Sequence, residues 1–170
     1  MANSATIRTA CRFIKDYNPA IFAILEPMAS EHKRVGIGLK LGFHSSFSNA
    51  GEGGKIWVYF SNSILVFVIN MSNQIISIDV CQADQTPISR LSMVYAKCSR
   101  YSRRLLWDNI IALAAGTNGP WVVDGDFNAV LDRSERLGSR NHDLANSSEF
   151  RNAVDSAGLL DAGFAGNKFT

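Results

Sequence analysis

The chain has 170 residues, of which 46% are hydrophobic and 19% are charged, a composition typical of one folded domain and not of a disordered chain. Its 17 basic and 15 acidic residues leave a net charge of +2, which is too small to indicate nucleic-acid binding by itself. The longest apolar run, Ile64–Ile69, is far shorter than the roughly 18 residues that a membrane span needs.

The amino terminus and the cysteines bear on the compartment. Residues 1–13 lack the long apolar segment of a secretory signal. They contain Arg, Ser and Thr but no acid, as a transit peptide does, whereas their apolar residues at helical spacing favour an ordinary amphipathic helix. The three cysteines, Cys11, Cys81 and Cys98, show no metal-binding spacing and cannot all pair within one chain, which favours a reduced compartment.

The first part of the chain is expected to alternate helix, strand and helix before a series of strands. A helix is predicted over 4–17, where Asn18-Pro19 ends it, and a strand buried on both faces over 20–25. A second helix, weakened by two glycines, is predicted over 30–41. Five short strands are then predicted over 43–47, 55–60, 64–69, 74–80 and 91–96.

The second part is expected to alternate helix and strand. Helices are predicted over 102–115 and, capped by Ser147, over 147–157. A short buried strand is predicted over 121–123, and another begins over 159–161. This order predicts an α+β fold in which two sheets pack together and helices cover them, as a single domain over 1–170 whose one loose stretch is 132–146.

The segment from Trp121 to Asn128 is the strongest local signal of a functional site. A buried strand there is followed by an acid, a glycine, a second acid and an amide. Gly125 permits a tight backbone turn, Asp126 offers an oxygen ligand suited to Mg²⁺, and Asn128 can donate and accept hydrogen bonds beside it. An Asx-type turn that caps a strand end explains the same residues without any chemistry.

Glu26 and Tyr95 also stand at predicted strand ends. Pro27 forbids the helix that would otherwise explain Glu26, and a carboxylate at such a place requires a partner or a metal unless it is solvated. The Tyr95 hydroxyl could bind a phosphate oxygen, although aromatic core packing is the common role of such a residue.

The histidines and a basic cluster are weaker candidates. His32, His44 and His142 lie in polar stretches without metal-binding spacing, so a solvated ring is expected for each. Three arginines, Arg100, Arg103 and Arg104, stand near a helix start with Tyr101 and Trp107, where they could meet a phosphate backbone or form a solvated helix face.

Four stretches in this order resemble the endonuclease/exonuclease/phosphatase superfamily, which has the DNase I-like fold, and most closely the endonuclease domains of plant non-LTR (LINE-type) retroelements. Gly125–Asn128 resembles the family's G-D-F-N signature, and 18–27 resembles the strand that supplies its metal-binding glutamate. Met93–Ala96 resembles the strand that carries its active-site tyrosine. Residues 150–160 with 163–170 resemble the closing block of the plant elements, and 104–107 and 119–121 fit the intervening helix and turn.

The resemblance implies a two-sheet sandwich flanked by helices and hydrolysis of DNA phosphodiester bonds with Mg²⁺, or alternatively Mn²⁺. Glu26 would bind the metal, and Asp126 would orient or activate the attacking water. Asn128 and Tyr95 would steady the scissile phosphate. A DNA substrate would place the protein in the nucleus.

The chain also departs from the family pattern. Compared with the family, it is expected to lack the first strand, which carries an Asn of the metal site, and the last strands with their Ser-Asp-His segment. Asp124 adds a charge where the family has a small or apolar residue. We therefore expect weak or lost nuclease activity. Two alternatives are a phosphomonoesterase or phosphoinositide phosphatase of the same fold, and a non-catalytic nucleic-acid-binding module or retroelement remnant.

Overall fold

The computed structural model describes residues 4–132 and 144–163. The chain divides into two compact units. The first unit comprises 1–95 and 119–125, and the second comprises 96–118 and 126–170. That the two units act as one domain stays a prediction. In the described ranges, no helix is long and apolar enough to cross a membrane.

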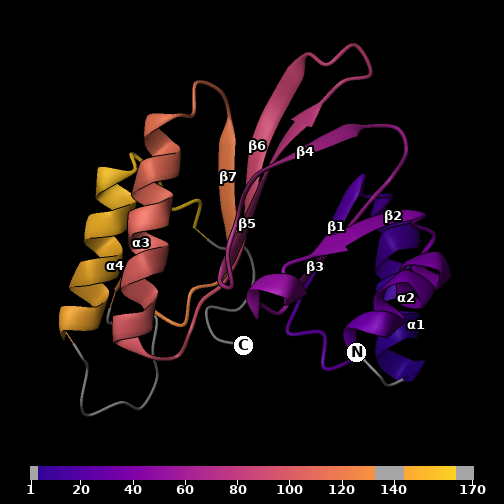
Figure 1. The fold of residues 1–170 in the computed structure, drawn as a ribbon, viewed down its shortest axis with the longest axis horizontal. Helices are drawn as coiled ribbons and strands as arrows, with labels where there is room; N and C mark the ends of the chain where they lie inside the picture. The colour runs from indigo at the N-terminus through magenta and orange to yellow at the C-terminus, as the bar shows by residue number, and fades with distance from the viewer. Residues whose placement is uncertain (1–3, 133–143, 164–170) are drawn as a thin grey trace. The chain divides into compact units, whose positions relative to one another are not determined.

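In the first unit, two helices pack against a three-stranded sheet. Helix α1 (Ser4–Tyr17) has the predicted bounds, and α2 (Arg34–Leu41) follows a 3-10 turn at Glu31–Lys33. The antiparallel sheet has the strand order β1-β3-β2, formed by β1 (Ile21–Leu25), β3 (Ile56–Phe60) and β2 (Ser45–Ser48). Figure 1 shows α1 and α2 on one side of this sheet.

Strand β3 connects the two hydrophobic cores because its side chains alternate between the faces of the sheet. Trp57 and Tyr59 pack with Ile37 and Leu41 of α2 in the core beneath the helices. Ile56 and Val58 instead join the core that contains the inner residues of the second sheet. Two packed sheets with helices on an outer face are therefore confirmed.

The second sheet has the order β4-β5-β6-β7. Its strands are β4 (Leu65–Met71), β5 (Ile75–Cys81), β6 (Pro87–Tyr95) and β7 (Trp121–Asp126). The first three are antiparallel. Arg90 N–H donates to the Pro120 carbonyl and Ala96 N–H to the Asp126 carbonyl, so β7 advances in step with β6 and runs parallel to it.

A polar ladder holds β7 at the edge of this sheet. The hydroxyls of Ser77 and Ser92 lie 2.7 Å apart, and both residues are buried. Trp121 Nε1 donates to Ser92 Oγ at 2.9 Å. Because buried hydroxyls and indole nitrogens require partners, this chain of bonds fixes the start of the strand that leads to Asp126.

Several expectations about burial and boundaries are wrong. Strand β1 is mostly half-buried, with only Ile24 in the core, because it lies at a sheet edge. Strand β7 is not buried either: it alternates half-buried and exposed residues, and it continues through Asp126. Residues 159–161 form no strand. The last helix begins before Ser147, so that residue does not cap it.

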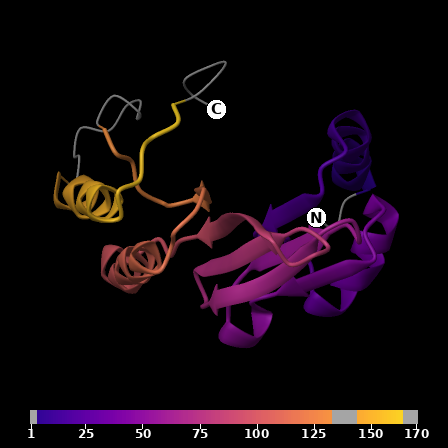
Figure 2. The same cartoon turned by 90° about the horizontal axis from the view of Figure 1, so that it is seen from above.

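The second unit is built on two helices, α3 (Arg100–Ala115) and α4 (Leu144–Ser156). They lie side by side in Figure 1, and Figure 2 shows both nearly end-on. Glu149 joins them, because its Oε1 accepts from Arg100 Nη2 at 2.8 Å and from Arg104 Nη2 at 2.9 Å. The Arg100 hydrogen bond, and then that of Arg104, lower the pKa of Glu149 to about 2 against the opposing effect of burial.

Candidate active site

Glu26 lies directly beyond the last residue of β1. Its N–H donates to the Lys55 carbonyl at 2.8 Å, which continues the pairing of β1 with β3 by one residue. Its φ of +48° lies in the left-handed region that few residues other than glycine adopt. A non-glycine residue held there costs free energy, and such residues are concentrated at functional sites.

The Glu26 carboxylate is held in its ionised form by two donors. The Tyr95 side chain hydrogen-bonds to it, and Lys55 Nζ lies 3.1 Å from Oε1. The Tyr95 hydrogen bond first, and then Lys55, hold the pKa of Glu26 below its usual value. The side chain is 42% exposed, so this anionic oxygen group is accessible from solvent.

Asp126 and Asn128 form a tight turn at the end of β7. Asp126 Oδ1 accepts the N–H of Asn128 at 2.9 Å, which makes an Asx turn, and Asn128 has a φ of +47°. Asn128 Nδ2 donates to the Ala96 carbonyl at 2.7 Å. The Asx-type turn that explains these residues without any chemistry is therefore present, and Asp126 is nevertheless exposed.

Gly125 and Phe127 explain why this turn needs its sequence. Gly125 has a φ of +142°, and a Cβ there would lie 2.0 Å from the Val94 carbonyl oxygen, so only glycine fits. Phe127 packs against Phe150 and Trp107, with ring centroids 4.8 and 6.4 Å away. These ring contacts anchor the turn against α3 and α4.

The predicted site residues therefore form two clusters. Glu26 and Tyr95 come together in the first unit, and Asp126 and Asn128 in the second. Lys55 was missed by sequence reasoning, although it opens the predicted strand over 55–60. Asp124 is exposed on β7.

The secondary candidates take structural or solvated positions. His32 and His44 are exposed, and His142 lies outside the described residues. The arginine cluster is not a uniform solvated face, because Arg103 is buried and binds the carbonyls of Lys97 and Cys98. Arg104 stacks over the exposed Tyr101 ring at 5.2 Å.

The carboxylate oxygens of Glu26 are suitable ligands for a magnesium ion. Mg²⁺ takes oxygen ligands and is commonly held by one or two carboxylates, with water and phosphate oxygens completing its coordination. An ionised, accessible carboxylate meets that requirement. Over residues 4–132 and 144–163, no group of three or more His, Cys, Asp or Glu side chains converges, so those residues offer no all-protein metal cage.

Comparisons with known proteins found a matching family profile and matching solved structures. A profile of the Endonuclease/Exonuclease/phosphatase family matches residues 1–169. The endonuclease domain of TRAS1, a telomere-specific non-LTR retrotransposon, superposes with a TM-score of 0.69 at 15% identity over 96% of this chain and 69% of that one. The human Nocturnin catalytic domain gives a TM-score of 0.47 at 16% identity, over 74% of this chain and 58% of that one. ANGEL2, a 2',3'-cyclic phosphatase, gives a TM-score of 0.45 at 13% identity, over 75% of this chain and 45% of that one. No curated protein matches in sequence.

Proposed function

Since this chain belongs to the endonuclease/exonuclease/phosphatase family, we propose that it hydrolyses phosphodiester bonds of DNA in a Mg²⁺-dependent reaction. Family membership supports hydrolysis of phosphate esters in general. The observation that carries the finer proposal is Glu26, an accessible carboxylate kept ionised by Tyr95 and Lys55 at a strained strand end.

Each residue has a distinct part in this proposal. Glu26 would hold Mg²⁺ or Mn²⁺, which when bound supplies Lewis-acid stabilisation of charge on the phosphate and the leaving oxygen. Asp126 would accept a proton from the attacking water, because its Oδ1 is engaged with Asn128 and its second oxygen can face solvent. Asn128 would donate the second proton of its side-chain amide to a phosphate oxygen, since the first is hydrogen-bonded to the Ala96 carbonyl.

The Tyr95 hydroxyl has a single proton and donates it to Glu26 here, so it first orients the metal-binding carboxylate. Donation to the scissile phosphate would require that proton to leave Glu26. Lys55 provides a positive charge beside the same carboxylate, which favours an incoming phosphate but competes with the metal.

Nicking of supercoiled plasmid DNA tests the proposal. Wild type should nick weakly with Mg²⁺ and not with EDTA, and Glu26→Gln and Asp126→Asn should each reduce that rate at least about 100-fold. Asp124→Asn is the matched control, because it removes an exposed carboxylate from the same strand as Asp126 and should leave the rate unchanged. Equal nicking by wild type and Glu26→Gln would contradict the assignment of the metal ligand.

A second candidate is a non-catalytic nucleic-acid-binding module, favoured by the lack of a converging acidic trio among the described residues. DNA binding by a folded chain that is unaffected by EDTA and by Asp126→Asn, without nicking, would support it. Turnover of a phosphomonoester but not of DNA would instead favour the phosphatase branch of the family.

A further inference from the structure

Arg103 is a charged residue in an unusual place. It lies in the first turn of α3, yet only 2% of it is exposed, and among the residues that the structure describes it is the largest fully buried side chain. Burial of a guanidinium is costly unless its N–H groups are bonded. Arg103 Nη1 donates to the Lys97 carbonyl and to the Cys98 carbonyl, both at 2.7 Å.

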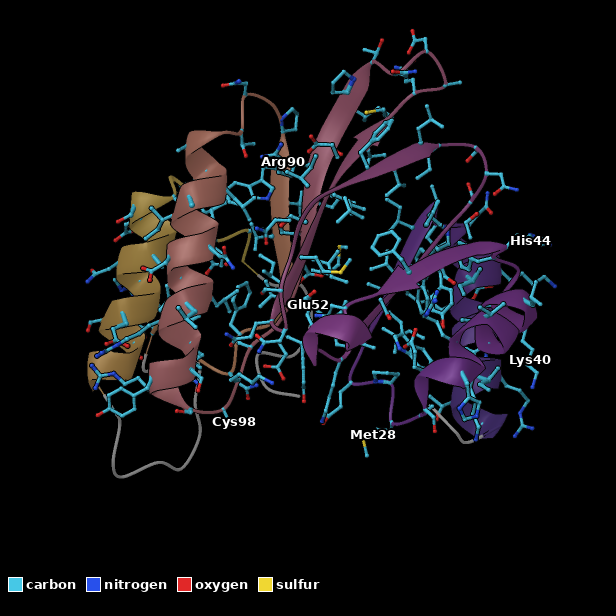
Figure 3. The ribbon with its side chains drawn as sticks, viewed as in Figure 1. Met28, Lys40, His44, Glu52, Arg90 and Cys98 are labelled. Atoms are coloured by element: carbon cyan, nitrogen blue, oxygen red, sulfur yellow. The ribbon has the colours of Figure 1, made fainter. Side chains whose placement is uncertain are left out.

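These two carbonyls belong to the short loop over 96–99 that enters α3. Figure 3 labels Cys98 in this loop, at the end of α3 where the chain enters the helix. The Ser99 side chain makes no capping hydrogen bond at this helix start. The Arg103 side chain acts on the loop and not on the helix N–H groups, because it donates to the two loop carbonyls and so fixes their position.

The same loop makes the backbone contacts that orient the Asp126–Asn128 turn. Ala96 N–H donates to the Asp126 carbonyl at 2.8 Å, and the Ala96 carbonyl accepts from Asn128 Nδ2 at 2.7 Å. A carbonyl oxygen only accepts, so this bond fixes which end of the Asn128 amide faces the loop. Hydrogen bonds therefore link Arg103 to the loop, and the loop to Asp126 and Asn128, and all of these residues belong to the second unit.

We propose that Arg103 is a positioning residue, which sets the direction of the Asn128 amide by clamping the carbonyls of Lys97 and Cys98. This inference rests on the proposed function and assigns Arg103 no contact with substrate. A displaced loop would rotate the amide away from the reacting phosphate, and the substitution would remove no exposed side chain, because Arg103 is buried. The loss should therefore fall on kcat and not on KM, because misplacement of about 1 Å can cost about 100-fold in rate.

Arginine is suited to this role in a way that lysine is not. The guanidinium stays protonated when it is buried and has a rigid, planar set of donors, whereas a buried ammonium loses its proton readily. Arg103→Lys should therefore retain the fold and only part of the clamp. Arg103→Met should retain the apolar packing of the side-chain stem but none of the hydrogen bonds to the two loop carbonyls.

The test combines kinetics on a fluorescent DNA substrate with NMR of the Asn128 side-chain amide. Arg103→Lys should lower kcat about 10- to 100-fold per folded molecule with KM nearly unchanged. In an Asn128→Ala background the same substitution should cost less than about twofold, since it acts through Asn128. Arg12→Met, at an exposed arginine on α1, is the control and should change neither constant.

The NMR arm separates this inference from the proposed function. The Asn128 side-chain amide signals should shift in Arg103→Met, or in Arg103→Lys if the Met variant does not fold, and stay fixed in Arg12→Met. Unshifted signals, or a full kcat effect that persists in the Asn128→Ala background, would overturn the positioning role. Absence of cleavage by wild type would remove the proposed function, and the amide signals would then decide the positioning role alone.

Discussion

Gly125→Ala is the substitution for which the structure makes the sharpest stability prediction. Gly125 has a φ of +142°, which a residue with a side chain rarely adopts. An added methyl group would stand 2.0 Å from the Val94 carbonyl oxygen and 2.8 Å from the Val94 carbonyl carbon. The obstacle is backbone of the neighbouring strand, so no flexible side chain can move aside to relieve it.

The expected loss follows from these two effects. Forcing alanine into this backbone conformation costs about 1–3 kcal/mol. Displacing a packed backbone costs about 1–3 kcal/mol more. We therefore expect the free energy of unfolding to fall by about 4 kcal/mol, which corresponds to about 8–16 °C in Tm for a chain of this size.

Urea unfolding followed by tryptophan fluorescence measures this loss. Gly119→Ala is the matched control, because it adds the same methyl group just before β7, where no atom lies within 4 Å. The control should change the free energy of unfolding by less than about 0.5 kcal/mol. Equal stabilities for Gly125→Ala and Gly119→Ala would refute the reasoning that only glycine fits at Gly125.

Three further predictions concern charge and packing. Lys55→Met removes a cation that competes for the Glu26 carboxylate, so Mg²⁺ should bind several-fold more tightly by calorimetry. Glu149 has a folded pKa of about 2, below its ordinary value of 4.5, so its stabilisation is present above pH 4.5 and is lost as the pH falls toward 2. Over that pH range, the free energy of unfolding of wild type should therefore fall by about 1–2 kcal/mol more than that of Glu149→Gln in acid unfolding experiments, after allowance for solvent screening. Phe150→Ala opens the buried aromatic cluster and should cost about 3–4 kcal/mol in urea unfolding, whereas Leu105→Ala, at a 70% exposed side chain, should cost less than about 0.5 kcal/mol.

Each of these predictions has an outcome that would contradict it. Unchanged or weaker Mg²⁺ binding in Lys55→Met would mean that this amine does not compete for the carboxylate. Parallel acid-unfolding curves for wild type and Glu149→Gln would mean that the two arginine pairs contribute nothing to stability. Equal losses for Phe150→Ala and Leu105→Ala would contradict the burial of the aromatic cluster.

The helices and strands could largely be predicted because their signals are local. Helix α1 has its predicted bounds, since apolar residues recur at helical spacing and Asn18-Pro19 ends the pattern. The exposure of β7 could not be predicted, because Trp121-Val122-Val123 reads the same in a central strand and at an edge. Which strand lies beside it depends on pairing over long stretches of sequence, and a short apolar run carries no information on that.

The positions of some candidate site residues could be predicted from sequence, whereas their roles stay predictions. Glu26 was identifiable from a strand end followed by proline. Lys55 was not, because its place beside Glu26 follows from the register of β1 with β3. The burial of Arg103 had a signal that sequence reasoning did not use: it precedes Leu106, Trp107 and Ile110 at helical spacing, so it belongs to the apolar face of α3.

The central claim is that Glu26 is the metal ligand of a phosphodiesterase. A Mg²⁺ titration followed at the side-chain carboxyl carbons of the glutamates tests it most directly. Glu26 should show a saturable change in the millimolar range or below, and the exposed Glu52 should show none. A folded chain in which the Glu26 signal stays fixed through saturating Mg²⁺, or moves no more than that of Glu52, would contradict the claim.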